Sequence, residues 1–476
     1  MSRLFFNNVA GATSNARYNV SKTKTKKQAD ADVASMLDAF TAKSVSGKLT
    51  VGIMGMGYVG VPLAEAFVRA GTPVIGFEIL QNRADDLNAG KSYLGHIEDE
   101  RIQRMVDSGN FKATIDQKML KEADAILICV PTPLDKYHHP DLSYVTSTCE
   151  SITPHLRKGH LIVLESTTYP GTTQDIMRPI LEKSGLIAGR DFALAYSPER
   201  EDPGNIDFET STIPKLVGAD SEDERGMSKL VYDRIVETVM VPNSRTAEAA
   251  KLTENIFRWV NIGLVNELKL VYDKMGIDVW DVIEAAGSKP FGFMPFYPGP
   301  GVGGHCIRID PYYLTWKARE HGMSTRFIEL AGEVNIHMPQ HVVNRLMEEL
   351  NKRHSKALSG SKILLSGIAY KKNIDDMRES PSMEVWHLLE EYGAEVEFYD
   401  PFIDTVPETH EFPQYAGRKS MAWDVEKLKT FDAAVVTTAH SFVDYSAMAE
   451  NIPLVIDTRN ISADLTEELK AKVAKA

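Results

Sequence analysis

The sequence predicts an α/β protein in which two Rossmann-like parallel-sheet domains are joined by a central domain built on a long helix. Three observations predict this fold class: a glycine-rich turn follows a short apolar strand near residue 55, apolar residues repeat at helical spacing over about residues 246–275, and strand-like and helical segments alternate again beyond residue 345. A chain of 476 residues is also too long for a single hydrophobic core. We expect an amino-terminal extension at 1–46 and three domains at 47–237, 238–345 and 346–476.

Composition and charge exclude several classes of protein. The formal net charge of −13 argues against a nucleic-acid surface, because phosphate binding needs a concentrated basic face. Three cysteines are too few for a disulfide framework and suit a reducing compartment, so we expect a cytoplasmic location. No stretch approaches the roughly 20 apolar residues of a membrane span, and no metal site is predicted. The amino-terminal extension, expected to be partly disordered with a short helix at about 30–41, is assigned no function.

The first domain carries a dinucleotide-binding pattern. An apolar strand leads into Gly55-x-Gly57-x-x-Gly60 and then into a helical pattern through Ala70. Gly55 would make the turn, Gly57 would let a pyrophosphate approach the backbone, and Gly60 would let helix and strand pack closely. The alternative is a glycine turn that only packs a helix against a strand.

A second strand of this domain ends in an acidic residue. Glu78 follows the apolar run 73–77 and lies 21 residues after Gly57. A carboxylate at this position binds ribose hydroxyls and repels the additional phosphate of NADP, so NAD is the expected cofactor. Arg83 could reach the adenosine ribose or a phosphate, or it could be solvated.

Polar residues also follow three later strands of the first domain. Thr132, Thr167 and Glu199 each come shortly after a strand-like run. Ligand contacts gather beyond the carboxyl ends of the strands in a doubly wound sheet, so we expect these residues to line one cleft. Turn chemistry alone is the alternative at each position.

The helical pattern at about 246–275 ends at Gly276 and is long enough to join two domains. Lys251 and Asn255 are four residues apart and therefore share one face of this helix. A solvent-exposed pair is the alternative interpretation.

Residues 299–310 form a glycine-rich turn that delivers Cys306 and Asp310. Its glycines allow left-handed torsions and a close approach of the backbone to a ligand. We expect Asp310 to be the N-cap, and Pro311 the first residue, of a helix that continues to about residue 320. Cys306 would then precede a helix start, where the macrodipole favours a thiolate. A small buried residue is the alternative for this cysteine.

The last domain repeats the alternation of strands and helices. Its first strand, at 362–369, turns into a loop that carries Lys371 and Arg378, and its last predicted strand ends at Arg459. Cations at strand ends suit a nucleotide diphosphate, and surface charge is the alternative.

Four separated motifs coincide in one order: Gly55-Met-Gly-Tyr-Val-Gly60, Lys251-x-x-x-Asn255, Gly303-Gly-His-Cys-Ile-x-x-Asp310 and Tyr370-Lys-Lys-x-x-x-Asp-x-Arg-Glu-Ser380. Together they closely resemble the nucleotide-sugar 6-dehydrogenases, the UDP-glucose and UDP-N-acetylhexosamine dehydrogenase family. The resemblance covers about residues 48–470. It implies an NAD domain, a UDP domain, a central helix that also dimerises, and a homodimer or higher homo-oligomer.

The resemblance also implies a four-electron oxidation of the sugar C6 alcohol to a carboxylate, with two NAD reduced in turn. It assigns Cys306 as the nucleophile that forms a thiohemiacetal and then a thioester. Lys251 and Asp310 match residues that assist proton transfer, and Asn255 matches one that binds the same oxygen. Thr167 and Glu199 match residues that position and activate water.

The implied binding residues form two sets. The cofactor set is Gly55, Gly57, Tyr58, Val59, Gly60, Glu78, Arg83, Thr132, Thr167 and Arg378, the last reaching the cofactor across a subunit boundary. The substrate set is Glu199, Lys251, Asn255, Tyr297, Gly303, Lys371 and Arg459.

The sequence around the cysteine bears on the choice of sugar. No arginine lies between Arg258 and Cys306, although the UDP-glucose branch carries one there, and residues 291–301 and 310–317 resemble the N-acetylhexosamine branch. UDP-N-acetylglucosamine is therefore the expected substrate, for a surface polysaccharide precursor. UDP-glucose, UDP-N-acetylmannosamine and UDP-N-acetylgalactosamine are the rival substrates, and a non-catalytic nucleotide-sugar sensor is the rival class. Arg308 occupies a position where this branch often has proline, and the family pattern does not explain it.

Overall fold

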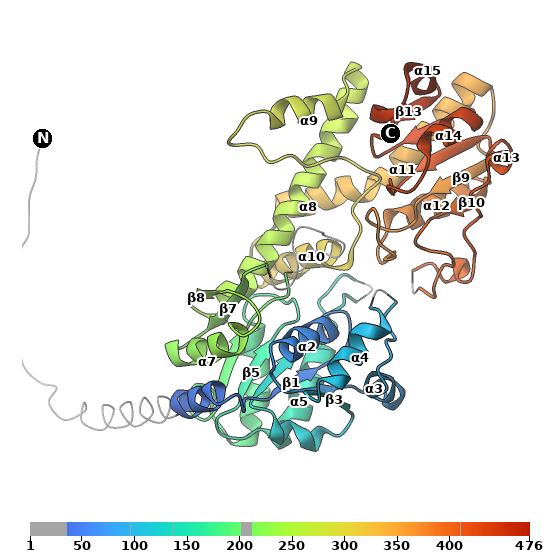
Figure 1. Ribbon diagram of the computed structural model, residues 1–476. Helices are drawn as coiled ribbons and strands as arrows, with labels where there is room; N and C mark the ends of the chain where they lie inside the picture. The colour runs from blue at the N-terminus through green and yellow to red at the C-terminus, as the bar shows by residue number, and fades with distance from the viewer. Residues whose placement is uncertain (1–35, 96, 136, 201–211, 410) are drawn as a thin grey trace, which may run out of the picture.

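The computed structural model describes residues 36–95, 97–135, 137–200, 212–409 and 411–476, without the side chains of His305 and Cys306. Two sheet domains lie at opposite ends of a long helix, so the predicted fold class is confirmed (Figure 1). The expectation for residues 1–35 lies outside the described residues. Among those described, no helix combines the length and the apolar character needed to cross a membrane.

The first sheet has eight strands in the order β3-β2-β1-β4-β5-β6-β7-β8. All neighbouring strands are parallel except β6 and β7, which are antiparallel. Their bounds are β1 Val51–Met54, β2 Val74–Phe77, β3 Phe111–Thr114, β4 Ala125–Ile128, β5 Leu161–Leu164, β6 Ala193–Tyr196, β7 Lys215–Ala219 and β8 Thr238–Val241. The central strands are buried on both faces, which explains their continuous apolar runs.

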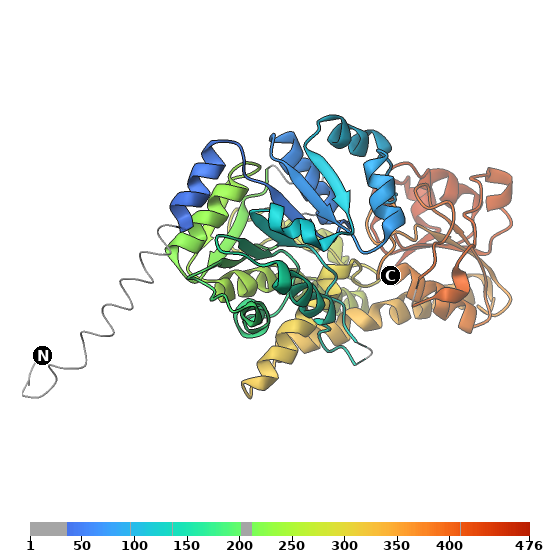
Figure 2. The ribbon, with the colours of Figure 1, turned by 90° about the horizontal axis from the view of Figure 1, so that it is seen from below.

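Helices cover both faces of this sheet. They are α2 Gly60–Arg69, α3 Gln81–Asn88, α4 Asp99–Asp107, α5 Ser143–Ile152, α6 Arg178–Leu181 and α7 Glu222–Tyr232. Residues 36–45 are helical and overlap the short helix predicted at 30–41. This helix lies beside α7, with Met36 and Phe40 buried in the core of the domain (Figure 2).

The central region is built on α8, Ser244–Met275, a helix of 32 residues that is about 48 Å long at 1.5 Å per residue. Asn243 caps its start by accepting a hydrogen bond from the backbone of Thr246, and Gly276 ends it with a left-handed φ of 72°. Helices α10, His305–Glu320, and α11, Arg326–His354, pack along α8, and α9 is Val279–Gly287. The long helix predicted at 246–275 is confirmed.

The second sheet has five parallel strands in the order β10-β9-β11-β12-β13. Their bounds are β9 Lys362–Ser366, β10 Glu395–Tyr399, β11 Ala433–Val436, β12 Val455–Asp457 and β13 Val473–Lys475. Its helices are α12 Pro381–Glu391, α13 Val425–Leu428, α14 Tyr445–Asn451 and α15 Glu467–Lys470. As in the first sheet, the loops that carry predicted binding residues leave from the carboxyl ends of strands.

One predicted helix boundary is wrong. Helix α10 begins at His305, so Asp310 and Pro311 lie inside it and are not its N-cap and first residue. Gly304, with φ 87°, ends the glycine-rich turn directly before the helix. The Asp310 side chain lies beyond the first turn of α10, so it does not cap that helix, and it accepts a hydrogen bond from Asn255 of α8 instead.

Candidate active site

Three predicted catalytic side chains meet where α10 packs on α8. Lys251, Asn255 and Asp310 are 5%, 0% and 1% exposed. The Asn255 side-chain N–H donates to the Asp310 carboxylate, and the Asn255 oxygen accepts from the Arg258 guanidinium. The alternative of a solvent-exposed pair on α8 is therefore wrong. A lysine and a carboxylate held this way form a group that can exchange protons with a bound ligand.

Burial governs the charge of this group. Desolvation raises the pKa of the Asp310 carboxyl to about 6, while the Lys251 ammonium and the Asn255 hydrogen bond act in the opposite direction. A carboxyl with this pKa is mostly ionised at pH 7 and still accepts a proton more readily than a surface aspartate.

Cys306 lies in the first turn of α10, four residues before Asp310. Residues four apart share a helix face, and the first turn is where the macrodipole favours a thiolate. The Cys306 side chain lies outside what the structure describes, so its role as the nucleophile stays a prediction.

The glycines ahead of Cys306 allow the turn to pack closely against the second sheet domain. A Cβ on Gly303 would lie 2.6 Å from the Cβ of Tyr370 and 2.9 Å from Pro381. A Cβ on Gly299 would lie 2.5 Å from the Arg459 guanidinium. The sequence predicted that the glycines let a ligand approach the backbone closely. Among the described atoms, it is side chains of the second sheet domain that approach the backbone here. Two predicted substrate residues, Gly303 and Arg459, are part of this domain contact.

The described contacts of Tyr297 lie elsewhere. Its ring stacks on Trp280 of α9 at 5.1 Å between ring centroids, and it shares no described contact with the Lys251, Asn255 and Asp310 group. The structure therefore does not bring this predicted substrate residue to that group within one chain.

The glycine motif of the first domain has the geometry that a dinucleotide needs. Gly55 has φ 95°, and a Cβ on Gly60 would lie 1.9 Å from the carbonyl oxygen of Gly55. No described atom lies within 4 Å of where a Cβ on Gly57 would be, so this side of the turn is open. Glu78 directly follows β2, where its carboxylate accepts a hydrogen bond from Tyr93 at 3.1 Å, and Arg83 stacks over the Tyr93 ring. These residues fit a pyrophosphate on the turn and a ribose at Glu78.

Arg378 connects the two sheet domains within one chain. Its guanidinium lies 4.1 Å from the centre of the Tyr58 ring in the glycine motif, and it pairs with Asp376 at 2.6 Å. Lys371 belongs to the same loop. Arg378 thus lies beside the glycine motif of its own chain, whereas the family resemblance implied that it reaches the cofactor across a subunit boundary. Its contact with the cofactor stays a prediction.

The polar residues after strands β4, β5 and β6 lie at the same edge of the first sheet. The backbone carbonyl of Thr132 accepts a hydrogen bond from Tyr313 at 3.0 Å, which ties this edge to α10. Thr167 follows β5, and Glu199 follows β6, where one of its oxygens lies 3.3 Å from Lys215. Parallel strands therefore bring these three residues to one side of the domain. That they line one cleft stays a prediction.

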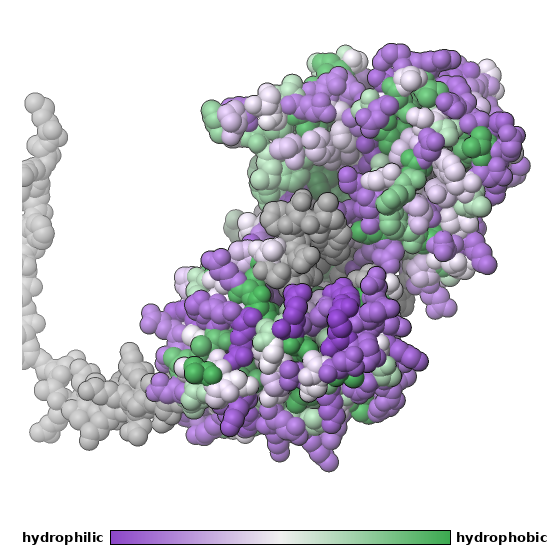
Figure 3. All heavy atoms as spheres, in the orientation of Figure 1, coloured by the Kyte–Doolittle hydropathy of each residue, from purple (hydrophilic) through white to green (hydrophobic). Residues whose placement is uncertain are grey.

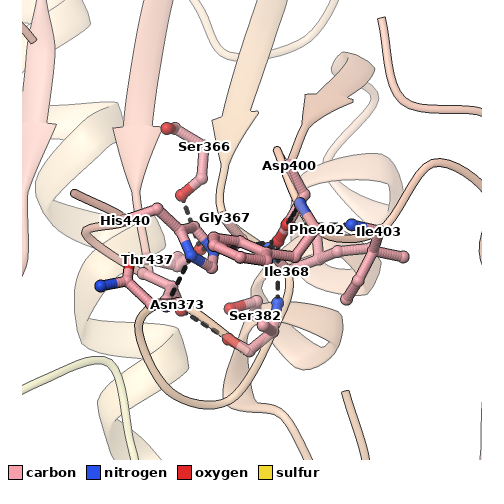
Figure 4. A network of polar contacts seen from close by, with 12 residues as sticks. Ser366, Gly367, Ile368, Asn373, Ser382, Asp400, Phe402, Ile403, Thr437 and His440 are labelled. Carbon is pink, nitrogen blue, oxygen red and sulfur yellow. Dashed lines mark hydrogen bonds and ion pairs between the residues drawn. The ribbon is translucent and has the colours of Figure 1, made fainter. Parts of the chain in front are cut away.

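A buried network that the sequence did not reveal supports the loop of the second domain that carries Lys371. The Asp400 carboxylate, after β10, accepts hydrogen bonds from backbone N–H groups that include Ile368 at 2.7 Å (Figure 4). It also accepts from Nε2 of His440 at 3.1 Å, while Nδ1 of that ring accepts from the backbone of Asn373. The network fixes the start of the loop that carries Lys371. Burial acts to raise the pKa of Asp400, but hydrogen bonds, with His440 first among them, hold that pKa below its usual value.

Two further supports join α8 to its surroundings. Glu248 is fully buried and accepts hydrogen bonds from the backbone N–H groups of Gly171 and Thr173, which fixes the segment that follows Thr167. The Asn266 oxygen accepts from the backbone of Gly299 at 3.0 Å and so anchors the start of the glycine-rich turn. The buried face of α8 that holds both residues also carries Lys251, Asn255 and Lys269, so no apolar stripe marks it in the sequence.

Models of three domains of one family match the chain in order. The "UDP-glucose/GDP-mannose dehydrogenase family, NAD binding domain" matches residues 49–236, the central domain of that family matches 245–337, and its UDP binding domain matches 364–464. The first match confirms the NAD cofactor predicted from the glycine motif.

Curated relatives and solved structures point to the same family as the domain models. A UDP-N-acetyl-D-glucosamine 6-dehydrogenase from Pseudomonas aeruginosa is 35% identical over 88% of this chain and 96% of its own length. A UDP-N-acetyl-D-mannosamine dehydrogenase from Escherichia coli (strain K12) is 36% identical over 82% and 94%. The structure of a UDP-D-ManNAc dehydrogenase from Pyrococcus horikoshii, 32% identical, superimposes with a TM-score of 0.78 over 88% of this chain and 96% of that one.

Proposed function

Since the chain belongs to the UDP-glucose/GDP-mannose dehydrogenase family and is an NAD-dependent UDP-sugar 6-dehydrogenase, we propose that its substrate is UDP-N-acetylglucosamine. The product is the corresponding uronic acid, a precursor for a surface polysaccharide. The observation that carries the choice of sugar is the cysteine region, which has no arginine between Arg258 and Cys306 and resembles the N-acetylhexosamine branch at 291–301. The relative from Pseudomonas aeruginosa supports this choice.

The first step oxidises the C6 alcohol to an aldehyde. Lys371 and Arg459 hold the nucleotide diphosphate, and the Asp310 carboxylate, with Lys251 beside it, accepts the proton of the alcohol. Bound NAD supplies the acceptor for the hydride that leaves C6 in each oxidation. Asn255 keeps the Asp310 carboxylate in one orientation throughout.

The second oxidation proceeds through Cys306. Its thiolate adds to the aldehyde carbon, and Lys251 stabilises the charge that develops on the oxygen of the thiohemiacetal. Loss of a second hydride from this oxyanion gives a thioester. Glu199 then takes a proton from water, oriented by Thr167, as the water oxygen attacks the thioester carbon. The carbon–sulfur bond breaks, and the thiolate of Cys306 is restored as the acid forms.

We also propose that the protein works in the cytoplasm as a homodimer or a higher homo-oligomer. Exposed apolar side chains lie on the segment after α9, namely Phe291 at 70%, Met294 at 63% and Tyr297 at 47%. Hydrophobic residues are visible around α9 on the face drawn in Figure 3. A second copy covering this segment would explain its composition, and it would bring Tyr297 toward a substrate.

A second candidate substrate is UDP-N-acetylmannosamine, which is favoured by the Escherichia coli relative at 36% identity. A non-catalytic sensor is the candidate from a different class. It is disfavoured by the buried group of Lys251, Asn255 and Asp310, because a site that only binds has no need of a proton-transfer pair.

The test is a panel of UDP-N-acetylglucosamine, UDP-N-acetylmannosamine, UDP-N-acetylgalactosamine and UDP-glucose at equal concentration, with NADH and acid counted together. We expect the highest kcat/KM with UDP-N-acetylglucosamine and two NADH for each uronate. Preference for another sugar would refute the choice of substrate. One NADH with release of aldehyde would refute the four-electron reaction, and the absence of NADH with every sugar would support a sensor.

A further inference from the structure

A buried lysine lies beside the proposed water-activating residue. The Nζ of Lys215 is 2.6 Å from the Glu165 carboxylate and 3.3 Å from the Glu199 carboxylate. The side chain of Lys215 is 5% exposed and that of Glu165 is fully buried, whereas that of Glu199 is 21% exposed. The lysine therefore spans from the interior of the first domain to the carboxylate at its edge.

The fold explains how Lys215 reaches this edge. Strand β7 runs antiparallel to β6, with Tyr196 paired to Gly218, so the first residue of β7 lies near the carboxyl end of β6. Glu199 follows that end by three residues, and Glu165 directly follows β5. The antiparallel strand thus delivers its amino-terminal residue to the side of the sheet from which the cleft residues project.

Titratable groups from several elements surround Lys215. Glu165 comes from the end of β5, Tyr232 from α7 and Cys129 from the end of β4, and each interacts with the lysine. Tyr232 donates its hydroxyl hydrogen bond to Glu165. Burial acts to lower the pKa of Lys215, but the two carboxylates raise it above its ordinary value, so the side chain is an ammonium ion at every working pH.

Each oxygen of the Glu199 carboxylate has a polar contact, and together these contacts fix the orientation of the carboxylate. One accepts from the backbone N–H of Arg200 at 2.7 Å, and the other faces Lys215. The Arg200 guanidinium is turned away and pairs with Glu254 of α8 at 2.7 Å. The negative charges of both Glu165 and Asp310 act to raise the pKa of Tyr196, so this cluster lies near the group of Lys251, Asn255 and Asp310.

We propose that Lys215, held by Glu165, is a positioning residue for thioester hydrolysis: it keeps Glu199 ionised and oriented toward the attacking water. The proposal rests on the proposed role of Glu199. Lys215 itself exchanges no proton and breaks no bond. It acts only on the step in which Glu199 takes a proton from water while the carbon–sulfur bond to Cys306 breaks. Both hydride transfers precede that step, so Lys215 affects hydrolysis and leaves NADH formation within the first turnover intact.

The test compares four variants of the full-length protein in rapid-mixing and steady-state assays with NAD and the preferred UDP-sugar. Lys215→Met removes the cation but leaves Glu165 buried without its partner, which threatens folding. The double variant Lys215→Met with Glu165→Gln removes both buried charges and keeps an acceptor for Tyr232. Lys215→Arg restores the positive charge. Lys269→Met is the matched control, because Lys269 is 1% exposed and pairs with Asp273 at 2.6 Å on α8.

We expect the double variant to give a burst of two NADH per subunit, followed by steady turnover about a hundredfold slower than in the unaltered protein. The acid limb of its steady-state pH profile should move to higher pH, because the cation that is removed contacts Glu199 directly, whereas the anion removed with it contacts that cation. Lys215→Arg should recover much of the rate, and Lys269→Met should behave like the unaltered protein.

Unchanged steady turnover in the double variant would overturn the proposal. So would an equal loss of burst and steady turnover, because that result indicates a structural role. Failure of the proposed function is a separate outcome, since the unaltered protein would then form no acid from any UDP-sugar.

Discussion

The hydrogen bond between Asn255 and Asp310 gives the sharpest prediction about proton transfer. Asn255→Ala removes the donor to a carboxylate that is 1% exposed and has a pKa of about 6. A hydrogen bond to a charged group contributes about 1.5–3 kcal/mol. At 1.36 kcal/mol per unit, its loss raises the pKa of Asp310 by about 1–2 units, to about 7–8.

The assay is the pH profile, between pH 5 and 10, of the rate of NADH formation in the first turnover, which precedes hydrolysis by Glu199. At pH 7 the ionised fraction of Asp310 should fall from about nine tenths to between a half and a tenth. Because only the ionised carboxylate accepts the substrate proton, the acid limb should move to higher pH by the same 1–2 units. Any loss of direct contact between Asn255 and the sugar should lower the plateau without moving the limb.

Asn261→Ala is the matched control, since that asparagine is on the same helix and its amide donates only to the backbone of Phe257 at 2.7 Å in the described structure. Its pH profile should match that of the unaltered protein. An acid limb that stays in place in Asn255→Ala, with a lower plateau, would refute the assignment of Asp310 as the proton acceptor.

Two further predictions concern the second sheet domain. Asp400→Ala should cost about 3–5 kcal/mol in urea unfolding at pH 7, because it leaves His440 and several buried N–H groups without their acceptor. Folding lowers the pKa of Asp400, so the stability that its ionised carboxylate contributes is fully present above the pKa of the unfolded chain. That stability is lost as the pH falls through the pKa of the folded state. A difference in unfolding free energy between Asp400→Ala and the unaltered protein that persists unchanged at low pH would contradict this. Gly303→Ala should lower kcat/KM at least about tenfold and cost about 1–3 kcal/mol, because its Cβ would lie 2.6 Å from Tyr370 and 2.9 Å from Pro381. Normal kinetics in that variant would show that the turn does not need its close contact with the second domain.

Local patterns in the sequence predict much of this fold. The central strands of the first sheet are short apolar runs, and α8 combines a long helical repeat with an N-cap at Asn243 and a terminal Gly276. The glycine motif is equally local, because its three glycines and Glu78 carry the whole signal. These features need no knowledge of tertiary contacts.

The supports of the site could not be predicted in the same way because they join distant segments. Asp310 looked like a helix cap because an Asp-Pro pair favours that position, yet its partner is Asn255, 55 residues earlier. Lys215 looks like an ordinary charged residue at the start of a strand, and only the antiparallel pairing of β6 and β7 reveals its two carboxylate partners. Asp400 and His440 likewise follow different strands and meet only in the folded sheet.

The proposed mechanism depends on Cys306 carrying the sugar as a thioester that Glu199 helps to hydrolyse. The decisive experiment determines the intact mass of Glu199→Gln after incubation with NAD and UDP-N-acetylglucosamine, followed by peptide mapping. We expect a covalent adduct of the oxidised UDP-sugar on Cys306, which is absent when Cys306→Ala is added to Glu199→Gln. A protein that forms acid or NADH in the first turnover and carries no adduct at Cys306 would contradict the mechanism.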